Sequence, residues 1–372
     1  MSLDRIIKYL LIFVPIAIIA DFVLHLDPVL VFILAALGVI PLADLIGEAT
    51  EELAIHTGPK LGGLLNATLG NAAELIITIF ALNEGLLDLV RASITGSILG
   101  NLLLVLGLSI LLGGWKHGLQ IFDRRTAGLN ATMLILAVVA LAVPSLFDVA
   151  IQENRAAELG LSEGVAVIMI ILYGLSVLYS FTHSNDTPAS QPEEAVVGAS
   201  VPPVPRADEH KAKWSVRTSL LILLAATVGI AVLSEALVSS VEPVTAQLGL
   251  TEFFIGIIII PLIGNIAEHL VAVQVALKNK MELSLAVSLG SSLQIALFVA
   301  PVLVFISLLM NGGGQSLLLV FNNFELIALI AASIVAAFIA LDGESNWLEG
   351  AMLLAVYIII ALAFFYLPAV GV

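Results

Sequence analysis

Long apolar runs recur along almost the whole chain, and this feature limits the possible folds more than any other. A run of about 18 or more mostly apolar residues is typical of a helix that crosses a lipid bilayer. Of the 372 residues, 60% are hydrophobic and only 12% are charged, whereas about a quarter of the residues in a soluble domain are charged. The sequence therefore predicts an all-α integral membrane protein.

Charged or Gly/Pro-rich turns divide the apolar runs into eleven predicted transmembrane helices. The first run follows Arg5 and Lys8, but no small-residue cleavage site comes before polar sequence, so we interpret it as a retained helix and not as a signal peptide. The predicted segments are residues 6–24, 28–55, 60–83, 87–112, 127–147, 163–182, 216–240, 251–277, 282–310, 319–340 and 347–367.

The region between the sixth and seventh segments has the composition of a soluble linker. It is rich in Pro, Ser, Glu and Ala and cannot bury an apolar face. We therefore expect an N-terminal helix in residues 1–27, a first five-helix group in 28–182, an acidic, Pro-rich cytoplasmic linker in 183–215 and a second five-helix group in 216–372.

Basic residues predict the orientation, because Lys and Arg are enriched in short cytoplasmic loops. With eleven helices and a cytoplasmic N-terminus, all of the 14 basic residues except Arg91 and Arg155 fall on the cytoplasmic side. The C-terminus is then outside, and the expected location is the plasma (inner) membrane of a prokaryote.

Charge and cysteine content exclude several classes of function. The formal net charge is −15, whereas nucleic-acid binding requires a basic surface and is therefore not expected. Solvated acidic loops and the attraction of cations both fit this charge. The chain has no cysteine, which excludes disulfides, thiolate metal ligands and cysteine nucleophiles.

Several motifs recur at a fixed offset of 194 residues. Gly70-Asn71 recurs as Gly264-Asn265, Ala73-Glu74 as Ala267-Glu268, and Gly96-Ser97 as Gly290-Ser291. The chain thus looks like one extra helix followed by two five-helix repeats. Because five is odd, the repeats would cross the membrane in opposite directions, as in many secondary transporters, whose substrate sites lie near the bilayer midplane. Channels can also be duplicated.

Glu74 and Glu268 are predicted to lie deep in the hydrocarbon. Glu74 follows the turn at Pro59-Lys60 by about fifteen residues, which places it near the middle of a helix at roughly 1.5 Å per residue. A carboxylate there costs at least about 2.5 kcal/mol and usually faces a cavity or a partner. A protonated glutamate that bonds a neighbouring helix is the alternative, but its recurrence in both repeats favours a functional site.

Each glutamate has an asparagine three residues before it, so Asn71 with Glu74, and Asn265 with Glu268, share one helical face. Two carboxylates and two amide oxygens suit a hard cation such as Ca²⁺, which prefers about six to eight oxygen ligands. Without the cation, desolvation and mutual repulsion favour protonated carboxyl groups. Competition between Ca²⁺ and protons for the same carboxylates would produce antiport.

Helix-breaking residues accompany both motifs. Pro261 removes a backbone hydrogen bond and can free carbonyl oxygens toward a cavity. Gly70 and Gly264 permit local unwinding or close approach of helices, and ordinary packing through small residues is the alternative.

Four stretches carry the repeated motifs: residues 70–76 (GNAAELI), 96–102 (GSILGNL), 264–269 (GNIAEH) and 290–296 (GSSLQIA). They resemble the two signature repeats of the Ca²⁺/H⁺ exchanger family within the calcium/cation antiporter superfamily. The resemblance covers nearly the whole chain after the first helix. Ile266 stands where the family more often has Ala, which concerns local packing and not the ligands.

The resemblance implies export of cytosolic Ca²⁺ in exchange for H⁺ by alternating access, with eleven helices. It implies Ca²⁺ binding by Glu74 and Glu268, with Asn71, Asn265, Ser97, Ser291 and Gln294 nearby. Roles in proton movement or gating fall to His269, Asn101 and Ser292, and to the acidic residues Glu48, Glu51, Glu52 and Glu235. A packed neutral His269 and solvated charges at helix ends are the alternatives. Helix packing or unwinding falls to Gly70, Gly264, Pro261, Gly96 and Gly290.

Three other functions compete with Ca²⁺/H⁺ exchange. Na⁺-driven exchange would require additional sites for a monovalent ion, and a passive divalent-cation channel would conduct without counter-transport. A membrane-embedded protease is suggested faintly by Glu51-Glu52 with His56, but the further catalytic histidines are missing. We therefore expect no enzymatic activity and no cofactor, with Ca²⁺ and H⁺ as substrates and the lipid bilayer as partner; a homo-oligomer stays open.

Overall fold

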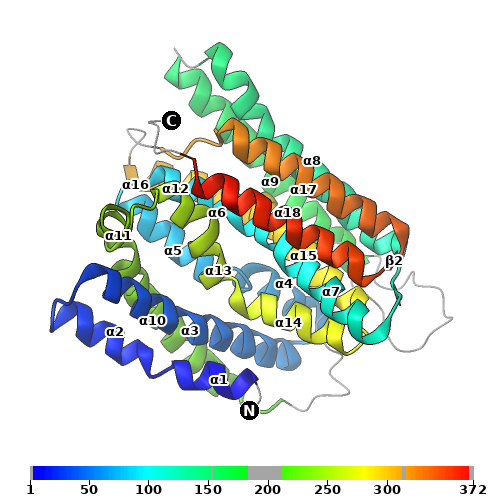
Figure 1. The fold of residues 1–372 in the computed structure, drawn as a ribbon, viewed down its shortest axis with the longest axis horizontal. Coiled ribbons are helices and arrows are strands. Elements are labelled where there is room, and N and C mark those ends of the chain that lie inside the picture. Colours follow the sequence, from blue (N-terminus) through cyan, green and yellow to red (C-terminus); the bar gives the residue numbers. More distant parts are fainter. Residues whose placement is uncertain (1–2, 152–153, 183–211, 312–315, 368–372) are drawn as a thin grey trace. The chain divides into compact units, whose positions relative to one another are not determined.

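The computed structural model describes residues 3–151, 154–182, 212–311 and 316–367, and most of these residues are helical (Figure 1). Among the described residues, the only strands are β1 (Gln120–Ile121) and β2 (Glu344–Ser345), which form a short antiparallel pair. Most of the predicted linker, residues 183–211, lies outside the described residues. An almost wholly helical chain agrees with the predicted class.

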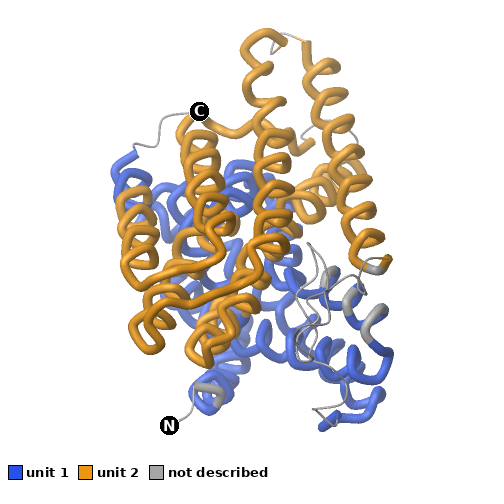
Figure 2. The backbone as a smooth tube through the Cα atoms, turned by 90° about the vertical axis from the view of Figure 1, so that its right-hand side faces the viewer, with its two compact units in different colours: residues 1–96, 204–267, 361–372 blue, residues 97–203, 268–360 orange. Residues whose placement is uncertain are grey.

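The chain folds into two compact units, which Figure 2 shows in different colours. Unit 1 comprises residues 1–96, 204–267 and 361–372, and unit 2 comprises residues 97–203 and 268–360. Each unit therefore takes segments from both of the five-helix groups predicted from the sequence.

Unit 1 is built around α3 and α10, which pack against each other along an antiparallel contact. A methyl group on Gly38 of α3 would meet Leu233 of α10, and one on Gly229 of α10 would meet Leu42 of α3, so each glycine leaves room for a leucine of the other helix. The helices of unit 1 are α1 (Leu3–Leu10), α2 (Phe13–Phe22), α3 (Pro28–Thr57), α4 (Pro59–Leu69), α5 (Ala72–Asn83), most of α6 (Leu87–Leu99), α10 (Val216–Ser239), α11 (Val241–Leu248), α12 (Glu252–Phe254), the π-helix η2 (Ile255–Ile259) and α13 (Ile260–Gly264).

Unit 2 contains a second antiparallel pair, α8 and α17. Gly128 near the start of α8 lies beside Leu341 near the end of α17, and Ser145 in the second half of α8 accepts a hydrogen bond from the backbone N–H of Phe321, just before α17. The helices of unit 2 are the π-helix η1 (Gly100–Val105), α7 (Leu106–His117), α8 (Arg124–Ile151), α9 (Arg155–Thr182), nearly all of α14 (Ile266–Leu277), α15 (Met281–Gln294), the π-helix η3 (Ile295–Val299), α16 (Ala300–Asn311), α17 (Asn323–Asp342) and most of α18 (Trp347–Phe365).

All eleven predicted segments contain helix, but three of them are broken. Eight helices of the described residues are long and apolar enough to cross a membrane, or nine if the bent pair Val241–Leu248 and Glu252–Gly264 forms one span. The broken segments are α1 with α2, α4 with α5, and α12–α13 with α14. The chain is thus a multi-pass membrane protein, and the count of eleven spans stays a prediction.

Element boundaries follow the same offset as the sequence motifs. Adding 194 residues to the bounds of α5 gives the bounds of α14, and the same addition converts α7 into α16. The pairs α3 with α10 and α8 with α17 occupy roughly corresponding positions in the two predicted repeats, and both pairs are antiparallel. Opposite crossing of the membrane by two repeats requires this relation, although the inverted repeat itself stays a prediction.

Candidate functional site

The first acidic motif lies at the break between α4 and α5. Asn71 leaves the helical conformation with φ −97° and ψ 24°, and α5 starts at the next residue. Glu74 follows in the first turn of α5 and is 0% exposed. The interruption therefore places a non-helical turn three residues before a buried carboxyl group.

The second motif has the same kind of break. Asn265 has φ −107° and ψ 11°, ends α13 and precedes α14. The Asn265 amide Nδ2 donates to the carbonyl oxygen of Pro261 at 3.2 Å, so the asparagine side chain caps the last turn of α13. The expected freeing of carbonyls near Pro261 is therefore offset at one carbonyl by this bond.

Unit 1 brings Glu74 together with the second break. Helix α13 packs against α5, and a Cβ atom placed on Gly264 would lie 3.6 Å from the Cβ of Glu74, an ordinary contact distance. Asn71 and Asn265 are both buried. Glu74 and the backbone of the second break therefore lie side by side inside unit 1, and each break carries a buried asparagine.

Unit 2 contains a hydrogen-bonded chain that ends on Glu268. The Asn101 amide Nδ2 donates to Ser291 Oγ at 3.0 Å, and Ser291 Oγ donates to Glu268 Oε2 at 3.2 Å. Asn101 and Ser291 are buried, whereas Glu268 is half-buried. This chain joins the π-helix η1, α15 and α14.

Four other predicted residues of unit 2 are also buried. Ser97 and Gln294 are buried in α6 and α15. Ser292 donates to the carbonyl oxygen of Ser288 one turn earlier in its own helix, and His269 is buried beside Glu268 in the sequence of α14. Among the described residues, no group of three or more histidine or acidic side chains could hold a metal ion.

The glycines that were predicted to pack or unwind helices differ in their surroundings and backbone conformation. A methyl group on Gly96 would overlap the backbone carbonyl of Ile257 in η2, so α6 and η2 approach closely at this point. A methyl group on Gly290 would meet nothing within 4 Å. Gly70 closes α4 in helical conformation, so the turn falls on Asn71 and not on the glycine.

The acidic residues near the end of α3 have different surroundings. Glu52 is buried, and its Oε2 accepts the backbone N–H groups of Lys213 and Trp214 at 2.8 and 3.1 Å. One turn later, His56 Nε2 is 2.8 Å from the Trp214 carbonyl oxygen. The sequence did not indicate this polar clamp, because Glu52 and Trp214 are far apart along the chain.

The other three acidic residues are closer to solvent. Glu48 lies 3.7 Å from Lys213 Nζ and 4.0 Å from Lys8 Nζ. Glu51 and Glu235 are exposed. Their expected role in guiding cations or protons stays a prediction.

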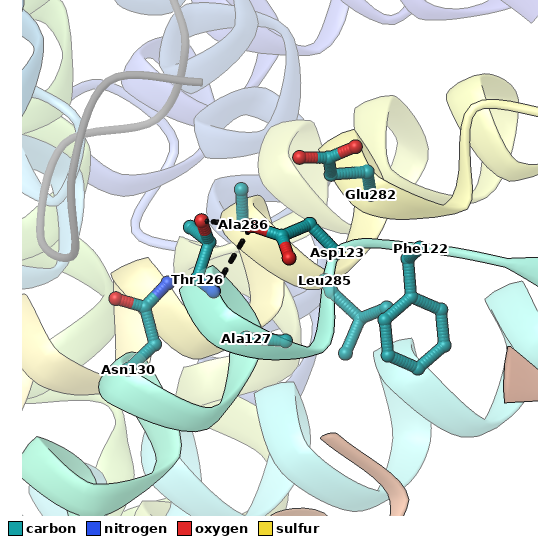
Figure 3. A pocket seen from close by; sticks show the side chains of 8 residues that line it. All are labelled: Phe122, Asp123, Thr126, Ala127, Asn130, Glu282, Leu285 and Ala286. Atoms are coloured by element: carbon teal, nitrogen blue, oxygen red, sulfur yellow. Dashed lines mark hydrogen bonds between the residues drawn. The ribbon is translucent and has the colours of Figure 1, made fainter. Parts of the chain in front are cut away.

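A small pocket in unit 2 is lined by residues from the start of α8 and the start of α15 (Figure 3). Its volume is about 10 Å³, roughly what one water molecule needs. Asp123 on its rim accepts hydrogen bonds from Thr126 Oγ1 and from the backbone N–H groups of Arg125 and Thr126. Burial raises the pKa of Asp123, but these hydrogen bonds outweigh burial and leave that pKa below its ordinary value. The lining residues are Phe122, Asp123, Thr126, Ala127, Asn130, Glu282, Leu285 and Ala286.

Broken apolar helices, each with a glutamate three residues after the asparagine at the break, are typical of multi-pass membrane proteins of the secondary-transporter class. The family model described as sodium/calcium exchanger protein matches residues 28–182 and 218–366. The chain therefore belongs to this family, and the relatives that follow place it in the Ca²⁺/H⁺ exchanger branch.

Three comparisons represent these relatives. A Ca²⁺/H⁺ antiporter of Aphanothece halophytica is 48% identical over 97% of this chain and 96% of the relative. The Ca²⁺/H⁺ antiporter ChaA of Bacillus subtilis is 43% identical over 95% of this chain and 97% of the relative. The solved structure of native YfkE superposes with a TM-score of 0.82 at 40% identity and covers 97% of this chain and all of that chain.

Proposed function

We propose that this protein exchanges Ca²⁺ for H⁺ across a membrane and exports Ca²⁺ from the cytosol. Relatives that match it over nearly their whole length are named Ca²⁺/H⁺ antiporters, and this supports the choice of substrates. The observation that carries the proposal is Glu74, a carboxyl group that is 0% exposed at a helix break and has an equivalent, Glu268, at the second break.

In this proposal Glu74 and Glu268 alternately hold Ca²⁺ and protons. A buried carboxylate is tolerated when a cation or a proton neutralises it, so release of one substrate requires uptake of the other. Amide and hydroxyl oxygens complete the coordination of Ca²⁺, which accepts mixed oxygen ligands in flexible geometry. The proposed oxygen donors are Asn71, Asn265, Ser97, Ser291 and Gln294.

Alternating access is the proposed cycle, because a single site then faces one side of the membrane at a time. The helix breaks at Asn71 and Asn265 are the proposed points at which backbone conformation changes. The process is transport without chemical conversion, so the proposal includes neither an enzymatic reaction nor a resident cofactor. The predicted orientation, with the N-terminus in the cytoplasm, belongs to the same proposal.

The test is Ca²⁺ uptake into proteoliposomes under an imposed pH gradient. We expect Glu74→Gln and Glu268→Gln each to lower the exchange rate at least about 100-fold, because one remaining carboxylate neither balances the ion nor carries the full proton load. Glu325→Gln is the matched control: Glu325 is equally a buried glutamate, but its Oε2 caps the start of α17 by accepting the backbone N–H of Asn322. Substantial exchange in both motif variants would reject the proposed site.

The same vesicles separate the competing transport modes. Ca²⁺ uptake that requires a Na⁺ gradient and ignores the pH gradient would indicate Na⁺-driven exchange. Ca²⁺ movement that requires no counter-ion would indicate a channel. The proposal expects uptake that follows the pH gradient in the absence of Na⁺.

A further inference from the structure

Three buried serines lie on α7 and α15, two helices of unit 2 that pack against each other, and we call this set of hydroxyls the seam. Ser109 on α7 and Ser284 and Ser288 on α15 are all 0% exposed. Within the described part of the chain, the hydroxyl oxygens of these three serines have no hydrogen-bond partner. A buried hydroxyl left without any partner costs about 1–3 kcal/mol, and such groups in proteins usually bond ordered water.

The serines on α15 face the hydrogen-bonded chain at Glu268. Ser291 is three residues after Ser288 and seven after Ser284, so one face of α15 carries all three. This face points toward η1, because Ser291 Oγ accepts a hydrogen bond from Asn101. Helix α15 packs against both η1 and α7, and Figure 1 shows α7 beside α15.

Ser109 lies at the same level of this contact as Ser284. Asn101 meets Ser291 at one end, and Lys116 near the end of α7 donates to the carbonyl of Leu277, shortly before α15 begins; α7 and α15 are therefore antiparallel. Ser109 is eight residues from Asn101, and Ser284 is seven from Ser291. The first separation includes part of the π-helix η1 and the second lies within α15; each is about two helical turns, so Ser288 falls between this level and Ser291.

Buried serines on helices commonly form a hydrogen bond within their own helix. A serine hydroxyl often donates to a backbone carbonyl three or four residues earlier, as Ser292 does to Ser288 at 3.0 Å and Ser333 does to Ile330 at 2.9 Å. Ser109, Ser284 and Ser288 do not make this bond. Their hydroxyls therefore stay available for another hydrogen-bond partner.

We propose that Ser109, Ser284 and Ser288 line a file of bound water that runs from Ser291 toward the turn at residues 278–280. The role of this file rests on the proposed function: it is a path by which protons move between the hydrogen-bonded chain at Glu268 and the end of unit 2 that carries Lys116. Each hydroxyl or water on the path accepts one proton and releases one, so no proton is consumed. Ser291 is the last member, because its hydroxyl donates to Glu268 Oε2.

Single cysteines can test whether water reaches the seam, because the chain has no cysteine of its own. The probe is Ag⁺, which reacts with thiols and is small enough to follow a file of water. The variants are Ser284→Cys and Ser288→Cys in the purified full-length protein. Ser333→Cys is the matched control, since Ser333 is 1% exposed in the same unit but bonds its own helix.

At intervals after Ag⁺ is added, samples are unfolded and the thiols that have not reacted are labelled with a maleimide. The measured quantity is the rate at which these free thiols disappear. We expect Ser284→Cys and Ser288→Cys to react at least about tenfold faster than Ser333→Cys. Equal rates at all three positions would overturn the water file.

Transport tests the role of the file. We expect the double variant Ser284→Ala with Ser288→Ala to lower the rate of Ca²⁺-dependent H⁺ movement about fivefold, without changing the Ca²⁺ concentration that gives half of the maximal rate. Ser333→Ala should leave the rate unchanged. A double variant as fast as this control would overturn the proton path. Failure of the unaltered protein to exchange H⁺ would reject the proposed function instead, and the Ag⁺ rates would still decide whether the seam holds water.

Discussion

The break before Glu74 and the break before Glu268 have nearly the same backbone geometry. Asn71 has φ −97° and ψ 24°, and Asn265 has φ −107° and ψ 11°. In both copies the helix resumes at the residue after the asparagine. Local sequence thus produces the same turn twice, at positions 194 residues apart.

The surroundings of the two glutamates differ. Glu74 is fully buried beside the backbone of Gly264, whereas Glu268 is half-buried and accepts a hydrogen bond from Ser291. The backbone turn is therefore alike at the two breaks, whereas the packing around it differs. The two carboxyl groups should accordingly differ in what supports them, and the following variants test that difference.

The largest contrast is expected between the two Gly-Ser pairs. A methyl group on Gly96 would overlap the carbonyl of Ile257, whereas one on Gly290 would meet nothing within 4 Å. Overpacking costs about 1–3 kcal/mol or more, so we expect Gly96→Ala to lower the Tm of the purified protein by at least about 5 °C or to prevent folding. Gly290→Ala should stay within about 2 °C of the unaltered protein. Similar losses in both variants would show that the two pairs pack alike.

An intermediate effect is expected from Ser291, which donates a hydrogen bond to the second glutamate. Loss of a hydrogen bond to a charged group costs about 1.5–3 kcal/mol, so Ser291→Ala should weaken apparent Ca²⁺ affinity roughly tenfold or more in exchange assays. Thr78→Val is the matched change near the first glutamate, because Thr78 Oγ1 donates to the main-chain carbonyl of Glu74 and not to its carboxyl group. It should change affinity less than about twofold; a comparable loss would contradict this assignment.

The smallest effect is expected outside both motifs, at Asp123. Its folded-state pKa is lowered, so its contribution to stability is present above its ordinary pKa of 3.8 and is lost as the pH falls through the lower folded value. Asp123→Asn should cost at most about 1 kcal/mol at neutral pH. The difference in Tm from the unaltered protein should shrink below about pH 4, and thermal unfolding measured from neutral to acidic pH checks this. A constant difference over that range would show that charge is not the cause.

The sequence predicted where helices occur, because apolar runs and charged turns are local signals. It also indicated Gly70 and Pro261 as points where a helix could unwind. It did not show that the turn falls on Asn71 and Asn265, since an i, i+3 spacing in an unbroken helix was the simpler expectation. Helix α11 and the three π-helices of the described residues were not predicted either, because the composition of these segments does not distinguish them from the neighbouring helices.

The sequence was enough to propose a set of candidate site residues, but it did not indicate their contacts. The duplicated motifs identified Glu268 and Ser291, which the structure joins by a hydrogen bond. The contact of Ser291 with Asn101 links segments 190 residues apart, and no local pattern encodes it. The contrast between Gly96 and Gly290 likewise depends on which helix lies opposite, whereas the motif is the same in both copies.

The clamp formed by Glu52 and His56 has a mechanical consequence. These side chains hold the backbone of Lys213 and Trp214, so the segment that leads into α10 is fastened to α3 before the helix starts. Tension in the preceding residues would consequently be shared between the C-terminal end of α3 and the N-terminal end of α10. A ligand or modification that pulls on the residues before Lys213 would therefore act on α3 and α10 at once.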